Sequence, residues 1–111
     1  FAFALRAEVR HSTGDCPGAY ILGRVTDAQA RPLAGVRLQL VDEYGNQQTQ
    51  ISKSGANEVG RYDFPLFGPP RRFYLSVVDA QNRPLSPVIE IPHGVGVAPQ
   101  ATCHWADWQR R

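Results

Sequence analysis

Glycine and proline interrupt this chain so often that a long helix has no room to form. Ten glycines and nine prolines are spread over 111 residues, and the apolar residues between them lie in short runs. Short alternating runs that are separated by turn residues about every eight to twelve positions are typical of an all-β sandwich. A helix would instead show apolar residues at three- and four-residue intervals, and no segment does. The sequence therefore predicts an all-β fold.

Eight segments fit this pattern as strands, and the stretches between them, including residues 11–18, are expected to be loops. The predicted strands are residues 1–10, 20–26, 35–42, 47–53, 61–66, 73–79, 88–91 and 101–108. The polar segment 47–53 suits a sheet edge, and so does 61–66, because Pro65 has no N–H to donate to a neighbouring strand. A chain of this length usually forms one domain. We predict a single immunoglobulin-like β-sandwich of seven to eight strands.

Two stretches of the chain repeat one another. Residues 25–33 read Val-Thr-Asp-Ala-Gln-Ala-Arg-Pro-Leu, and residues 77–85 read Val-Val-Asp-Ala-Gln-Asn-Arg-Pro-Leu. An aspartate at the start of a turn bonds to backbone N–H groups further on, and proline fixes φ where the chain leaves the turn. The repeat predicts two similar turns after two strand ends; a duplicated binding loop is the alternative.

Around these turns the chain resembles the carboxypeptidase regulatory-like domains. The resemblance rests on residues 23–42 and on Gly-Arg-Tyr-Asp-Phe-Pro-Leu at 60–66, and it covers roughly residues 20–91. It implies a transthyretin-like sandwich that serves as a non-catalytic extracellular module. The related Cna B-type pilin domains join a lysine on the first strand to an asparagine on the last. Here the only lysine is Lys53 and the last strand has no asparagine, so no such bond is expected.

The two cysteines lie near opposite ends of the chain, at Cys16 and Cys103. Metal sites usually take cysteines in close pairs, so the alternatives are two separate buried thiols or one disulfide. We favour the disulfide, which would tie an early segment to the last strand. Disulfides persist in oxidising compartments, and the expected location is therefore extracellular or at the cell surface, for a secreted protein.

Composition and motifs argue against several classes of function. The net charge is only +2 and the arginines are scattered, which does not favour nucleic-acid binding. No apolar run approaches the roughly 20 residues that span a bilayer. We find no Gly-x-Ser-x-Gly and no phosphate-binding glycine loop, so we expect no enzyme, no catalytic residue and no cofactor.

A metal site is not expected either. A zinc site at His93, Cys103 and His104 would conflict with the disulfide. Turn initiation accounts for most of the acidic residues at strand ends, although calcium at such a cluster remains a weaker alternative. These residues are Asp27, Asp42, Glu43, Asp63 and Asp79.

The first ten residues are the most informative segment for function. Odd positions are apolar and even positions from Arg6 onward are charged, which predicts a strand with one buried face. The apolar residues are Phe1, Phe3, Leu5, Ala7 and Val9. Such a strand belongs either to its own sandwich or, as a separate unit of residues 1–10 joined to a body of residues 11–111, to the open edge of a neighbour. Repeated donation would build an open filament from copies of the chain or from neighbouring domains.

Our leading functional prediction is therefore a structural subunit or module of an extracellular assembly such as a pilus-like filament or surface layer. The alternative is a carbohydrate-binding or accessory module of a secreted enzyme, which would bind polysaccharide through exposed rings. The candidate rings are Tyr44, Tyr62, Trp105 and Trp108. Trp105 and Trp108 are three positions apart, so on one strand they would point to opposite faces.

Overall fold

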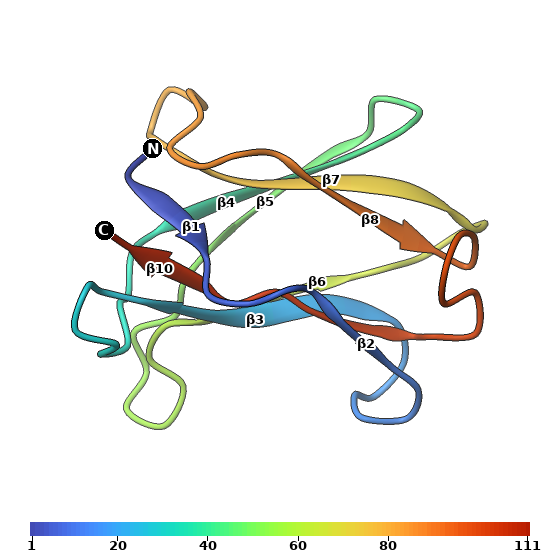
Figure 1. Cartoon of the computed structure of the whole chain (residues 1–111), viewed down its shortest axis with the longest axis horizontal. Coiled ribbons are helices and arrows are strands. Elements are labelled where there is room, and N and C mark those ends of the chain that lie inside the picture. Colours follow the sequence, from blue (N-terminus) through green and yellow to red (C-terminus); the bar gives the residue numbers. More distant parts are fainter.

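The computed structural model describes residues 1–111 as two β-sheets that pack face to face (Figure 1). No helix in it has the length and apolar character needed to cross a bilayer. The strands are β1 (Phe3–Leu5), β2 (Arg10–Ser12), β3 (Tyr20–Thr26), β4 (Arg37–Asp42), β5 (Gln47–Ile51), β6 (Arg61–Pro65), β7 (Arg71–Val78), β8 (Ile89–His93), β9 (Cys103–Trp105) and β10 (Trp108–Arg110). The prediction of an all-β sandwich is confirmed.

The first sheet is organised around the last segment of the chain. Strands β9 and β10 lie end to end and run parallel to β3 in a single register, with Leu22 opposite Trp105 and Val25 opposite Trp108. On the far side of this segment, β1 pairs with β10 and β2 pairs with β9, both antiparallel. β6 covers the other edge of β3. The ten short strands therefore occupy eight strand positions, as predicted.

The second sheet has the order β5-β4-β7-β8. Strand β4 alternates between half-buried and buried residues, whereas β5 is almost wholly exposed and lies at the edge, as its polar sequence predicts. Inward-facing residues of both sheets form one core, since apolar side chains leave water most fully between the sheets. Its largest members include Trp108, Tyr62, Phe64, Phe73, Ile21, Leu38, Leu40, Leu75 and Ile91.

The prediction of one continuous strand over residues 1–10 is wrong. Between Leu5 and Arg10 the chain advances five positions, while its partner moves only three, from Trp108 to Trp105. Two extra residues are therefore accommodated in a bulge at residues 6–9, which breaks the ladder. The even insertion preserves the alternation of faces, so that Val9 still packs against the core. The expected loop at residues 11–18 starts later than predicted, because β2 continues to Ser12.

A close approach of two backbones explains one glycine in β3. A Cβ atom built on Gly23 would lie 2.0 Å from the carbonyl oxygen of Ala106. The same carbonyl accepts a hydrogen bond from the buried Tyr62 hydroxyl. Gly23 therefore lets the last segment of the chain lie close against β3, which any larger side chain at this position would prevent.

The two repeated stretches form the same turn, as predicted. In the first, Asp27 Oδ1 accepts the N–H groups of Gln29 and Arg31 at 2.9 and 3.0 Å, and its Oδ2 accepts Arg31 Nε at 2.9 Å. In the second, Asp79 makes the matching bonds to residues 81 and 83. The residue before each arginine has positive φ, 64° at Ala30 and 61° at Asn82.

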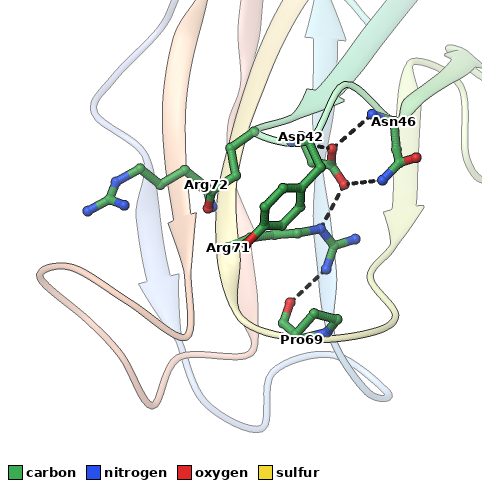
Figure 2. Close-up of polar contacts among 7 residues, drawn as sticks. Asp42, Asn46, Pro69, Arg71 and Arg72 are labelled. Carbon is green, nitrogen blue, oxygen red and sulfur yellow. Dashed lines mark hydrogen bonds and ion pairs between the residues drawn. The ribbon is translucent and has the colours of Figure 1, made fainter.

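A third turn uses the same chemistry in a buried setting (Figure 2). Asp42 Oδ1 accepts the N–H groups of Tyr44 and Asn46, and its Oδ2 accepts Asn46 Nδ2 and Arg71 Nε at 2.9 and 2.8 Å. Arg71 also donates to the carbonyl of Pro69. Burial alone would raise the pKa of Asp42, but the bonds from Asn46, Arg71 and Tyr44 outweigh it and lower the pKa to about 2. The charged pair therefore holds the β4–β5 turn against β7.

The matched turns provide a test of local backbone strain. Asparagine tolerates positive φ better than alanine, so Ala30→Asn should stabilise the protein by about 0.5–1 kcal/mol and Asn82→Ala should destabilise it by a similar amount. Urea denaturation of the two single variants measures both changes. Shifts of the same sign in the two variants would contradict this explanation.

Candidate functional site

The N-terminal segment lies beside the C-terminal segment, and both chain ends emerge at the same end of the sandwich (Figure 1). Among the five apolar residues predicted to join subunits, Phe3 is buried and belongs to the core. Leu5 and Val9 are partly buried against it. Phe1 is 70% exposed and Ala7 is exposed in the bulge. The structure thus places three of the five side chains against the core of their own chain.

Strand β1 is held by a short ladder with β10 and by backbone bonds on either side of it, from the Arg111 N–H to the carbonyl of Ala2 and from the Arg6 N–H to that of Asp107, both at 2.9 Å. It has three residue pairs with β10, from Phe3 opposite Arg110 to Leu5 opposite Trp108. The Phe3 N–H donates to the carbonyl of Leu85, which comes from the connection between β7 and β8 in the other sheet. Strand β1 therefore closes the gap between the two sheets at this end, and the bulge at residues 6–9 separates it from the rest of the chain.

A disulfide secures the opposite end of the N-terminal segment. Cys16 and Cys103 are bonded, with their Cα atoms 6.0 Å apart, and no free cysteine is present. The predicted pairing is confirmed. Because Cys103 begins β9, the bridge attaches the loop after β2 to the strand with which β2 pairs.

Loss of this disulfide should destabilise the domain substantially. The chain-entropy model assigns about 4–5 kcal/mol to a bridge that closes a loop of this length. We therefore expect the Cys16→Ser/Cys103→Ser double variant to lose that much unfolding free energy in urea denaturation. A loss below about 1 kcal/mol would show that the pairing of β2 with β9 is sufficient without the covalent bond.

Three histidines from distant parts of the sequence form a hydrogen-bonded row between the sheets. His104 on β9 is fully buried. Its Nδ1 lies 2.7 Å from Nδ1 of His11 on β2, and its Nε2 lies 2.9 Å from Nδ1 of His93 on β8. The sequence connected His93 and His104 only as disfavoured zinc candidates with Cys103, and it did not connect them with His11. The row joins the first sheet to the edge strand of the second.

This geometry suits proton sharing rather than a metal. His104 uses nitrogens on opposite sides of its ring for its two neighbours, so the three imidazoles do not converge on one point. No group of three or more metal-ligating side chains is arranged to hold an ion. With Cys103 in the disulfide, the three residues weighed for zinc cannot act together.

Proton counting sets a limit on the charge that the row accepts. Each N···N contact holds one hydrogen, because a hydrogen bond between two imidazoles needs one donor and one acceptor. The Nε2 atoms of His11 and His93 can each carry one further hydrogen, so the row can hold four in all. Three neutral imidazoles hold three, and the row therefore accepts one added proton. A second added proton would set N–H against N–H and break a contact. Burial, followed by repulsion from His93 and His11, lowers the pKa of His104 to about 4.

The row should make the fold sensitive to mild acid. Burial and the nearby Arg71 guanidinium also lower the pKa of His93. Histidines of the unfolded chain titrate near pH 6.5. Below that pH the unfolded chain therefore binds protons that His93 and His104 of the native chain do not bind. Stability should therefore be complete above about pH 6.5 and fall toward pH 4, by up to about 1.4 kcal/mol per pH unit for each histidine kept neutral.

The measurement is the urea midpoint at several values between pH 5 and 7.5. His104→Gln keeps one donor and one acceptor but does not titrate, and it should flatten the dependence. An equally steep dependence in this variant would assign the effect to other groups. The aspartates with lowered pKa values, Asp27, Asp42 and Asp79, titrate below this window.

The four aromatic residues considered for sugar binding do not form a common surface. Tyr62 and Trp108 lie in the core with 2% and 0% of their surface exposed, so neither ring is available to a ligand. Tyr44 is 68% exposed in the β4–β5 turn. Trp105 is half-buried on the outer face of the first sheet, where its Nε1 donates to the Ser12 hydroxyl at 3.1 Å. Trp105 and Trp108 face opposite sides of the sheet, as their spacing predicts.

Comparison with known proteins adds information about the fold. No family model and no curated protein matches the chain, so the resemblance to carboxypeptidase regulatory-like domains stays a prediction. Among solved structures, the C-terminal fragment of the pilus adhesin SpaC from Lactobacillus rhamnosus GG is similar, with a TM-score of 0.53 and 14% sequence identity. The likeness covers 86% of this chain but only 46% of that one. At this identity it shows a shared fold alone.

Proposed function

We propose that this chain is a non-catalytic structural module of an extracellular assembly, in which β1 of one copy pairs with the next copy. The observation that carries the proposal is the attachment of β1. It has three residue pairs with β10 and one buried anchor, Phe3, and it is connected to the body through a bulge whose residues 6–8 are exposed. A segment of this kind can exchange between identical sites, because the same backbone bonds form in either case.

The site that β1 occupies would accept the same strand from another molecule. The last strand would offer its backbone to the incoming segment, and Phe3 would fill the same place in the core. Head-to-tail repetition gives a heterologous contact that leaves one free strand and one free site at the ends, so it leads to an open filament.

Three further observations support an extracellular structural role. The disulfide suits an oxidising environment. The three histidines bond to one another and both sulfurs are bridged, so the side chains most suited to catalysis are engaged elsewhere. The fold is similar to that of a pilus adhesin fragment.

Strand exchange can be tested with a truncated chain and a peptide. A chain lacking residues 1–5 keeps the disulfide and β2, so it should stay folded with the site of β1 open. We expect it to bind a peptide of residues 1–10 with one-to-one stoichiometry in calorimetry. The same peptide with Phe3→Asp is the matched control and should not bind, because it would bury a charge in the core.

Assembly is measured separately by light scattering and negative-stain imaging of the full chain at increasing concentration. Oligomers or filaments that disappear in the truncated chain would support the proposal. A full chain that stays monomeric at every concentration would overturn it, whatever the peptide does.

A further inference from the structure

The outer face of the first sheet carries a depression of about 460 Å³. This volume lies within the usual range for small-ligand sites, roughly 300–1,000 Å³. Five parts of the chain border it: the bulge after β1, strands β3 and β6, the connection between β5 and β6, and the segment that carries β9 and β10. The lining residues used below are Arg6, Arg24, Arg61, Lys53, Glu58, Asp63, Trp105 and Asp107.

The three arginines of this depression have no partner in the chain. Elsewhere, Arg10, Arg31, Arg71, Arg72 and Arg83 form ion pairs with carboxylates, whereas Arg37, Arg110 and Arg111 do not and lie outside the depression. The guanidinium groups of Arg6, Arg24 and Arg61 make neither an ion pair nor a hydrogen bond, although each offers five N–H donors. Three separate segments thus bring exposed guanidinium groups, without partners in the protein, to one place.

The acidic groups in the same depression are already engaged. Lys53 Nζ lies 2.9 Å from an oxygen of Asp63 and 3.7 Å from one of Glu58. Asp107 Oδ1 accepts the backbone N–H of Arg24 at 2.9 Å. Four cationic and three anionic side chains leave a net charge of only +1, but the donors in excess all belong to the three arginines. The depression is therefore richer in donors than in acceptors, and a carboxylate or sulfate supplies acceptors in the geometry that a guanidinium prefers.

Trp105 gives the depression an apolar wall. The bond from its Nε1 to Ser12 holds the ring, and the Arg10 guanidinium lies over one face of it, 5.0 Å from the ring centroid, so a ligand can use only the part of the ring that lines the depression. An immobilised, half-buried indole beside Leu22 offers a flat surface on which the C–H face of a sugar ring can pack. An extended acidic peptide could bind to the arginines without contacting the Trp105 ring, so the ring favours a sugar as the ligand.

We propose that the depression bordered by Arg6, Arg24, Arg61 and Trp105 binds an acidic oligosaccharide. The arginines take its carboxylate or sulfate group, and Trp105 packs against the ring that carries this group. This inference does not rest on strand exchange, since Arg24, Arg61 and Trp105 lie on strands that stay in place, although Arg6 belongs to the bulge that would connect an exchanged β1 to its own chain.

Calorimetric titration of the full chain tests the proposal with defined probes. Tetragalacturonate presents carboxylates, sulfated maltotetraose presents sulfates, and maltotetraose carries no charge. We expect saturable binding of at least one acidic sugar, at least tenfold tighter than that of maltotetraose and weakened by added salt. The acidic sugar that binds more tightly identifies the anion.

Matched variants locate the site. Arg24→Gln/Arg61→Gln should weaken binding at least tenfold, whereas Arg37→Gln/Arg110→Gln removes two equally unpaired charges elsewhere and should leave it unchanged. Trp105→Phe should weaken binding of the sugar but not that of tetraglutamate. Failure of both acidic sugars to bind, equal losses in the two double variants, or tighter binding of tetraglutamate than of either sugar would overturn the proposal.

Discussion

The insertion of the last strand between β3 and the N-terminal segment is the interaction on which the rest of the molecule depends. Residues 103–110 supply both the parallel partner of β3 and the antiparallel partner of β1 and β2. Their inward side chains, among them His104 and Trp108, fill the middle of the sandwich. Without this segment β3 would lose its partner on one side and the N-terminal segment would have no strand to pair with.

One face of this segment contributes to the core, and the other faces the outside of the first sheet. Inward, Ala106 lies against Gly23 and accepts the bond from Tyr62, and His104 links the two sheets. Outward, Cys103 forms the disulfide and Trp105 borders the arginine-lined depression. The alternation of a single strand therefore places the structural and the candidate binding residues on opposite sides of one sheet.

Local patterns in the sequence predicted most of the fold. Alternation located the strands and the inward Phe3 and Leu5, and the aspartate turns were recognisable because all their bonds lie within five residues. The bulge at residues 6–9 was not predictable, since the extra residues keep the alternation and only the partner's register reveals them. Nor was the histidine row, whose members come from three distant segments and meet only when both sheets are in place.

The position of the disulfide determines how the molecule would respond to a pulling force on its two ends. Both termini lie at the same end of the sandwich, so such a load would separate the residue pairs one at a time. The pairs of β1 with β10 would open first and those of β2 with β9 would follow. The opening would stop at Cys16–Cys103, which carries the load covalently past all 86 residues between. Only the fifteen residues before the bridge and the eight after it could extend, by about 80 Å in all. The domain would then yield by a limited length, while residues 17–102 between the two cysteines carry no direct load.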